Sequence, residues 1–222
     1  PHNLIERGTS NPDSYEHKAA LKFIDNKVYQ KIGAAWLDVT ADMTTKGIVT
    51  RTTNKFKDSR ENKTVDVTDL DVAKLYSEGY GPSNGVIYFS DKTAGLDYPA
   101  LRLKNASELG AGLTIAAENP VYSQGHLNTT DKKPMAILTD AYTILSGSWD
   151  DTKSTLSTSS RVASNTTVNV SFVTGDKKET ASDPYQGGLA NLPRFMEAWG
   201  PSKTCTIRGS MVNLWNSVQS TG

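Results

Sequence analysis

The side chains that most often bind metals or act as nucleophiles are scarce in this chain. Its three histidines, His2, His17 and His126, stand far apart in 222 residues, and Cys205 is its one cysteine. None of these residues has the close spacing to another that a zinc site needs. Cys205 alternates with threonines in a predicted strand, which favours a buried, unreactive thiol over a nucleophile. We therefore predict no catalytic residue and no metal ligand among them.

Three aspartates close in sequence, Asp66, Asp69 and Asp71, are candidates for a calcium site. Carboxylate oxygens are ligands that Ca²⁺ prefers. The stretch lacks the central glycine and the distal glutamate of a twelve-residue calcium loop, so surface solvation and pairing with a helix dipole are favoured. We predict no cofactor, with Ca²⁺ as the weaker alternative.

A second acidic group, Asp140, Asp150 and Asp151 with Arg161, raises the alternative of a polysaccharide-acting enzyme or a glycan-binding module. Glycosidases place a carboxylate on either side of the bond they cleave. Nothing in the spacing singles these residues out, so loop solvation, or capping by Asp150, is the favoured explanation. We predict that the chain is not an enzyme. Two or three converging carboxylates of raised pKa would support the alternative.

The composition limits the class of partner. The chain has 24 basic and 24 acidic side chains and a formal net charge of zero, which makes nucleic acid a poor partner. Ser, Thr and Asn make up about 60 residues, a share typical of turn-rich and strand-rich proteins. The apolar runs are only a few residues long, so we predict no transmembrane segment. Because Pro1 is not an initiating methionine, we expect any signal or anchor segment to lie outside this sequence.

The elements that must position these residues are mostly short strands. Apolar, β-branched runs, most of them four to seven residues long, recur from residue 85 onward, separated by Gly, Asn, Asp and Pro. They lie at 86–89, 100–103, 113–116, 121–123, 135–138, 142–145, 167–173 and 204–208.

Two architectures fit these short strands and turns: a right-handed parallel β-solenoid, and a Greek-key β-sandwich or barrel. The strands are short, and Asn119-Pro120 forms a corner between two of them, with Gly125 at the next bend. Asparagines at such bends could stack their amides in ladders. We therefore favour a mainly β, β-helix-like domain with one or two short capping helices, although no strict sequence period is present.

The rest of the chain supplies an arm, a connection and helices. We predict an N-terminal arm and packing segment over residues 1–60, a solvated connection over 51–63, and a β-rich domain over 61–222. Thr68, Asp69 and Asp71 indicate the start of a short helix that ends before Gly79. Apolar residues at helical spacing after Asn191 and Pro193 predict a capping helix over 191–199; they are Leu192, Phe195, Met196 and Trp199.

Several longer blocks resemble a known family. They are 112–128 (GLTIAAENPVYSQGHLN), 133–141 (KPMAILTDA), 187–199 (GGLANLPRFMEAW) and 207–215 (IRGSMVNLW). They resemble a poorly characterised, minor-pilin-like family of bacterial exported proteins associated with type IV pili. Members begin with a hydrophobic anchor helix and continue into an aromatic, Pro-rich tail, and neither feature is found here. The resemblance implies structural roles for the Asn119-Pro120 corner and for the 192–199 block, and no catalytic residue.

The resemblance and the composition together predict an extracellular structural protein of a type IV pilus-like filament, acting as subunit, tip protein or adhesin. Its expected partners are other filament subunits, including copies of itself, with a glycan or surface contact as a further expectation. Trp149, Tyr185 and Trp215 are the candidate contact residues. Five Asn-x-Ser/Thr sequons, at Asn62, Asn105, Asn128, Asn165 and Asn169, are typical of a glycoprotein, although some arise by chance in such a composition.

Overall fold

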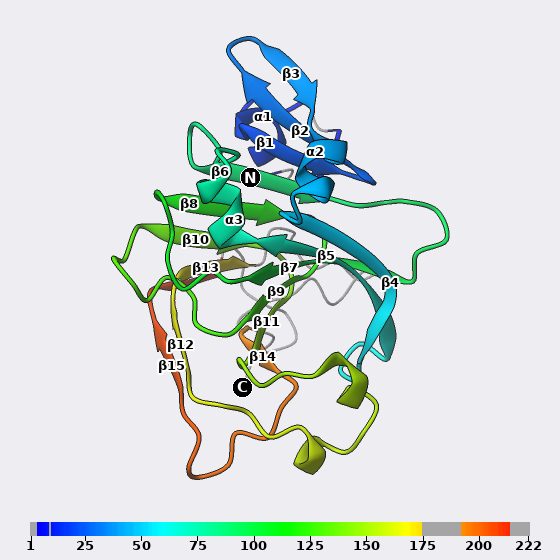
Figure 1. Ribbon diagram of the computed structural model, residues 1–222, viewed down its shortest axis with the longest axis vertical. Coiled ribbons are helices and arrows are strands. Elements are labelled where there is room, and N and C mark those ends of the chain that lie inside the picture. The colour runs from blue at the N-terminus through cyan, green and yellow to red at the C-terminus, as the bar shows by residue number, and fades with distance from the viewer. Residues whose placement is uncertain (1–3, 9, 175–191, 214–222) are drawn as a thin grey trace.

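A computed structural model of the chain describes residues 4–8, 10–174 and 192–213 (Figure 1). The predicted class is confirmed: the described residues are mainly β, with a few short helices. Within these described residues the sheets are open and mixed, and none closes into a barrel. The helices are α1 (Tyr15–Lys18), α2 (Thr40–Thr45) and α3 (Val72–Ser77). Two 3-10 turns, η1 (Asp151–Lys153) and η2 (Thr158–Ser160), lie between β11 and β12.

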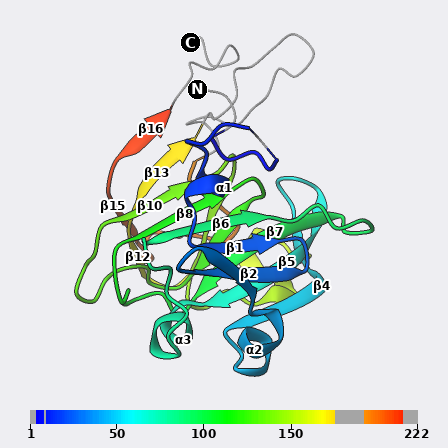
Figure 2. The same ribbon diagram turned by 90° about the horizontal axis from the view of Figure 1, so that it is seen from above.

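The larger sheet, sheet A, has eight strands. All those from β1 to β16 run parallel, whereas β2 is antiparallel to both β1 and β3, so β3 again runs in the direction of β1. Viewed from above, the parallel strands fan progressively from β1 to β16 (Figure 2), as twisted sheets do. From edge to edge, the strands of sheet A are β3 (Ala35–Asp38), β2 (Lys27–Ile32), β1 (Leu21–Ile24), β6 (Val86–Ser90), β8 (Leu113–Ala117), β10 (Met135–Leu138), β13 (Ser171–Thr174) and β16 (Met211–Asn213).

In the part of the chain that the structure describes, sheet B has six strands, and β4 alone is antiparallel to its neighbour. They are, in order, β4 (Val49–Asp58), β5 (Lys63–Asp71), β7 (Tyr98–Lys104), β9 (Val121–Gln124), β11 (Tyr142–Leu145) and β14 (Arg194–Phe195). A third, two-stranded sheet pairs β12 (Thr166–Asn169) in parallel with β15 (Cys205–Arg208), and an isolated bridge joins Leu127 to Val168 of β12.

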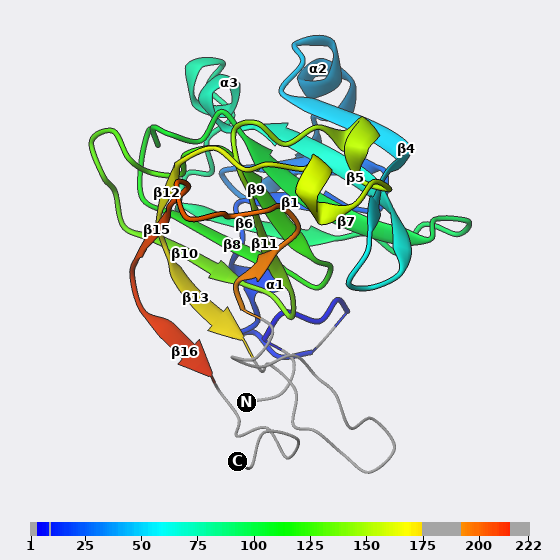
Figure 3. The ribbon, with the colours of Figure 1, turned by 90° about the horizontal axis from the view of Figure 1, so that it is seen from below.

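The chain alternates between the sheets from β5 onward. It passes from sheet B to sheet A and back through β11, and thereafter also visits the small sheet. The strands consequently follow one another along the long axis, with β3 at one end (Figure 1), while β13 and β16 lie side by side in the view from below (Figure 3).

The central core lies between the two sheets, because alternate residues of each strand point inward. Register places like side chains above one another: Ile87, Ile115, Ile137 and Phe172 are successive neighbours across sheet A, and all are buried. Side chains from sheet B, such as Leu103, join the same cluster.

Other segments cover the outside of the stack. Buried residues of α2, α3 and their flanks extend the core at one end. The N-terminal segment packs on the outer face of sheet A, where Ile5 and Ala19 contact a cluster with Tyr88, and the Tyr88 hydroxyl donates to the carbonyl of Ile5 at 2.8 Å. The described part of the predicted arm is therefore held by contact.

The solvated connection predicted over residues 51–63 was wrong. Most of it belongs to β4, which pairs antiparallel with β5 and has an irregularity between Thr52 and Phe56. Valine and threonines that favour strands outweigh the charged residues, and Phe56 is buried. The predicted boundary at residue 60 falls in the turn of this hairpin.

The helix predicted to start near Thr68 starts later. Thr68 and Asp69 are part of β5, because this strand continues its parallel pairing with β7 as far as Asp71. Asp71 instead caps α3, and its Oδ1 accepts from the amide of Lys74 at 2.9 Å. The run predicted as one strand over 167–173 is likewise two strands, β12 and β13, with Val170 between them.

The capping helix predicted over 191–199 was also wrong. Its described part forms β14 at Arg194–Phe195 and a bridge from Ala198 to Val162; Asn191 lies outside the described residues. The apolar side chains fit helical spacing, but they face two directions. Leu192 and Phe195 contact the central core, whereas Met196 packs on the opposite side of sheet B. Facing both sides in this way is what a strand does.

Candidate functional site

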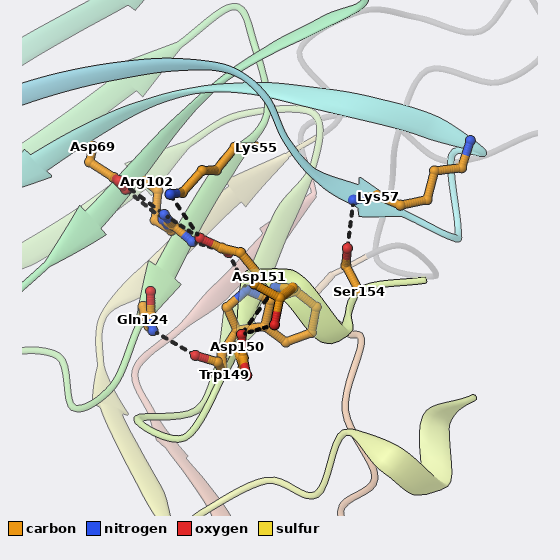
Figure 4. Close-up of polar contacts among 10 residues, drawn as sticks. Lys55, Lys57, Asp69, Arg102, Gln124, Trp149, Asp150, Asp151 and Ser154 are labelled. Atoms are coloured by element: carbon orange, nitrogen blue, oxygen red, sulfur yellow. Dashed lines mark hydrogen bonds and ion pairs between the residues drawn. The ribbon is translucent and has the colours of Figure 1, made fainter. Parts of the chain in front are cut away.

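The outer face of sheet B holds a buried arginine between two aspartates (Figure 4). Arg102, on β7, is 1% exposed. Its Nε and Nη2 donate to Asp69 at 2.5 and 2.9 Å, and its Nη1 and Nη2 donate to Asp151 at 2.7 and 3.2 Å. Asp69 lies directly beside Arg102 because β5 and β7 pair in register. Asp151 comes from η1, far along the chain.

Trp149 closes this cluster from outside. Its Nε1 donates to Asp151 Oδ1 at 2.7 Å, and its ring meets that of Phe56 edge-on at 5.7 Å. Its carbonyl accepts from Gln124 Nε2 at 3.2 Å. A further bond, from the amide of Lys57 to Ser154 Oγ at 3.0 Å, holds the same segment (Figure 4). Residues 146–163, which we call the sheet B cover, are thereby fixed over sheet B.

The electrostatics of this cluster favour structure over proton transfer. Burial lowers the pKa of Arg102, but its hydrogen bonds to Asp69 and Asp151 outweigh this and raise the pKa overall. The guanidinium therefore stays charged and neutralises both carboxylates. A carboxylate held in this way is a poor general base.

A second polar group lies under the same face. Tyr122 and Asp58 are both buried, and the tyrosine hydroxyl donates to Asp58 Oδ2 at 2.5 Å. Burial and the neighbouring Asp58 raise the pKa of Tyr122 well above its ordinary value, so this phenol remains a donor. Beside it, Arg194 of β14 forms an ion pair with Glu61 in the β4–β5 turn. These bonds tie the first hairpin of sheet B to its last strand.

Glu197 holds the start of the sheet B cover. It is 5% exposed, and it accepts from the amide and the hydroxyl of Ser146, each at 2.6 Å. Burial raises the pKa of Glu197, while the two bonds from Ser146 oppose that shift. The two hydrogen bonds from Ser146 to this carboxylate anchor the first residue of the sheet B cover.

The two edges of sheet A carry exposed apolar side chains, in contrast to the buried cluster on the outer face of sheet B. Seven large apolar side chains are exposed in the described residues, and five lie on β2, β3 and β16. They are Ile32 (54%), Trp36 (37%), Leu37 (47%), Met211 (47%) and Val212 (42%). Lys22 lies 4.4 Å from the Trp36 ring centroid. We call β3 and β16 the open edges, since neither has a second strand partner among the described residues. Unpaired edges of this kind are sites where another strand can add.

Trp149 is the one predicted contact residue that the structure describes, and it is not on these edges. Trp149 is 6% exposed and packs in the cluster just described, so its assignment as an exposed contact was wrong. The indole is buried because Phe56, which is distant in sequence, packs against its ring, and the neighbouring Asp151 accepts its N–H. Tyr185 and Trp215 lie outside the described residues.

The acidic residues considered for catalysis have separate partners. Asp151 binds Arg102, and Asp150 caps η1 by accepting from the amide of Thr152 at 3.0 Å. Arg161 donates to the carbonyl of Ser154. Asp140 follows β10 and has an interaction of its own.

The aspartates considered for calcium are also engaged. Asp66 accepts from the amides of Asn54 and Asp97 at 2.8 and 2.6 Å. Asp69 binds Arg102, and Asp71 caps α3. Within the described ranges, no group of three or more His, Cys, Asp or Glu side chains is arranged to hold a metal ion.

The corners carry the asparagine contacts. Asn119, between β8 and β9, bonds to the preceding turn of chain: Oδ1 accepts from the amide of Asp91 at 2.7 Å, and Nδ2 donates to its carbonyl at 3.0 Å. Pro120 precedes β9, and Gly125, with φ 82°, follows it. Asn128 and Asn169 exchange side-chain amide to carbonyl bonds at 2.9 Å each.

Burial separates the five sequons. Asn128 and Asn169 are 2% and 8% exposed and bonded to one another, so a glycan cannot be accommodated on them in the folded chain. The other three sequon asparagines, Asn62, Asn105 and Asn165, are exposed.

The remaining reactive side chains occupy ordinary structural positions. His126 lines a shallow hollow of about 280 Å³, and its Nδ1 accepts from the amide of Thr167 at 3.1 Å. Cys205 is half-buried in β15, and burial raises its pKa to about 11, which keeps the thiol protonated. The segment Gly81-Pro82-Ser83-Asn84-Gly85 matches the Gly-x-Ser-x-Gly pattern of serine hydrolases. It forms the turn before β6, whereas a nucleophile elbow joins a strand to a helix.

Comparison with protein-family models, with curated proteins and with solved structures gives no match to this chain. In the described part of the chain, the helices are too short and too polar to cross a membrane. The choice of a candidate site therefore depends on the geometry of the sheets alone. The strongest candidate is the pair of open edges of sheet A.

Proposed function

We propose that the chain is a structural subunit of an extracellular, type IV pilus-like filament, in which it serves as filament subunit, tip protein or adhesin. The observation that carries this proposal is the pair of open edges on one sheet. Sheet A has uncovered apolar side chains at both ends, where assembly into a larger structure would bury them.

A right-handed parallel β-solenoid is the architecture that we propose for this role. The alternation of parallel strands between two sheets supports it, as does the stacking of Ile87, Ile115 and Ile137 from one strand to the next. Asn119 adds a corner contact to the preceding turn of chain. Stacked units of this kind form rigid, elongated bodies whose ends need covering.

The polar network over sheet B also favours a structural role. Two of the aspartates considered for a glycan-cleaving enzyme are engaged: Asp151 is neutralised by Arg102, and Asp150 caps η1. The formal net charge of zero adds a further argument, because copies without a large net charge pack together without long-range repulsion.

Labelling of surface filaments tests this proposal. Filaments would be sheared from cells that produce the full-length protein and examined by negative-stain electron microscopy with an antibody against this chain. We expect label along the filaments or at their tips. Label confined to material inside the cells, with bare filaments, would contradict the proposal. Glycan cleavage by purified monomers would favour the enzyme instead.

A further inference from the structure

We propose that β3 of one molecule pairs in parallel with β16 of a second copy, so that sheet A continues from one molecule into the next. This inference rests on the proposed function and names the partner at the open edges.

Strand direction is the first argument. The strands from β1 to β16 are parallel, and the double reversal through β2 returns β3 to the same direction. The two edges of sheet A therefore have the same polarity. Placing β16 of one copy beside β3 of another makes a parallel pair like the five parallel pairs that join β1 to β16 within the sheet.

The faces of the exposed side chains give the second argument. Leu21 of the core pairs with Gln30, and Gln30 pairs with Leu37, so Leu37 and Ala35 lie on the core-facing side of sheet A. Trp36, between them, lies on the outer side. At the other edge, Met211 pairs with the core residue Phe172 and lies on the core-facing side.

Val212 completes this match, because it pairs with Val173 and therefore lies on the outer side. The register that places Met211 beside Ala35 and Val212 beside Trp36 aligns the faces of both edges. A shift by one residue would place apolar side chains on opposite faces, which disfavours that alternative. The preferred register covers four exposed apolar side chains: Trp36 and Leu37 of β3, and Met211 and Val212 of β16.

The proposed contact can repeat from one copy to the next. β3 and β16 are different surfaces, so the contact is head-to-tail, and each added molecule presents a fresh edge. A contact of this type forms an open chain of molecules when the rotation between copies does not close a ring. The equal numbers of basic and acidic side chains, 24 of each, remove net repulsion between copies.

Disulfide trapping tests this pairing in the full chain, with Cys205→Ser to remove the native thiol. Ala35→Cys and Met211→Cys would be combined in one molecule, since adjacent strands bring Cα atoms within the span of a disulfide. We expect a ladder of covalent oligomers under mild oxidation. The matched control replaces Met211→Cys by Leu156→Cys, a residue that is 50% exposed and away from both edges; it should remain monomeric. Equal ladders from both pairs, or none from either, would overturn the pairing.

Sedimentation velocity gives a second readout that needs no cysteine. We expect Trp36→Lys to weaken self-association at least about tenfold, because it places a charge in the new contact, and Leu156→Lys to leave it unchanged. Circular dichroism would establish that both variants are folded. Unchanged association of a folded Trp36→Lys variant would contradict the inference.

The two proposals fail in different ways. Antibody label on surface filaments, together with cross-links only to a different subunit, would leave the proposed function intact and overturn the β3–β16 pairing. A covalent ladder from the purified chain, together with bare filaments on cells, would support the pairing and overturn the proposed function.

Discussion

The outer face of sheet B and the open edges of sheet A reverse the usual distribution of charged and apolar residues. On sheet B, Arg102 is 1% exposed beneath the sheet B cover. On sheet A, Leu37 and Met211 are both 47% exposed. The difference lies in what covers each region, because residue type alone would predict the opposite.

A region is covered when a segment distant in sequence supplies partners for its side chains. A buried charge is tolerated only when its partners satisfy it, and Asp151 reaches Arg102 from 49 residues along the chain. An edge strand has no such partner within the described residues, so its apolar side chains remain in solvent. Five predictions test this contrast, in order of decreasing expected effect.

Replacement of Arg102 should have the largest effect. Arg102→Met removes the shared partner of Asp69 and Asp151 and leaves two half-buried carboxylates close together, and we expect a loss of about 3 kcal/mol in the free energy of unfolding. Urea denaturation measures this value. The control is Lys55→Met, since Lys55 reaches Asp151 only at 3.7 Å and is more exposed; it should cost less than about 1 kcal/mol. Equal losses would show that Arg102 is not the centre of the cluster.

Tyr122→Phe should have the next largest effect. It removes the hydroxyl that donates to the buried carboxylate of Asp58 while keeping the ring, which packs edge-on against Phe56. A bond to a buried charged group is worth about 2 kcal/mol, and we expect that loss in urea denaturation. Tyr29→Phe, at a site remote from this cluster, is the control. A loss below about 0.5 kcal/mol would mean that the Asp58 bond adds nothing net.

Trp149→Phe should cost less, about 1 to 2 kcal/mol, because it keeps an aromatic ring in the cluster but removes the N–H that donates to Asp151. If the cluster acts as one unit, the double variant with Arg102→Met should lose less than the sum of the two single losses. Strictly additive losses would argue that Trp149 and Arg102 act independently.

On the open edge, Leu37→Ser should change the free energy of unfolding of the monomer by less than about 0.5 kcal/mol, since surface positions away from special features are tolerant. Leu103→Ser, at a fully buried position of β7, is the contrasting variant and should destabilise severely. A large loss for Leu37→Ser in dilute monomer would mean that the edge is covered.

The smallest effect concerns Asp38 on β3. Hydrogen bonds from Thr40 and Lys27 lower the pKa of this carboxyl to about 2. Because the folded value lies below the unfolded value, the ionised group stabilises the fold above pH 4, and this contribution is lost as the pH falls toward 2. NMR titration of the side-chain carboxyl carbon should report a midpoint near 2. Thr40→Val should raise it, whereas Thr44→Val should not; a midpoint near 4 in the unmodified chain would contradict the prediction.

The strands from residue 85 onward were predictable because each is local. Short β-branched runs between turn residues mark β6 to β11 and β15, and the structure contains a strand at every predicted run. The helix predicted at residues 191–199 failed because two patterns competed there. Residues 192–199 satisfy helical spacing, but pairing of β14 with β11 and packing on both sides of the sheet are stronger than that periodicity.

The candidate site was less predictable. Exposed apolar residues on β3 and β16 look like ordinary strand residues in the sequence, and their exposure follows from their place at the ends of sheet A. Trp149 shows the converse, since an aromatic residue in a Ser/Thr-rich loop suggests a surface contact until Phe56 and Asp151 are seen around it. The edges are identified by the spatial order of the strands in sheet A, which no local sequence pattern encodes.

The sequence by itself determined the mainly β class, the positions of most strands and the corner residues such as Asn119. These depend on local alternation and turn chemistry, which act over a few residues. Only the tertiary structure decided that Arg102 is buried while Leu37 is exposed. Burial depends on which distant segments reach a surface, and the sheet B cover reaches one of these surfaces and not the other.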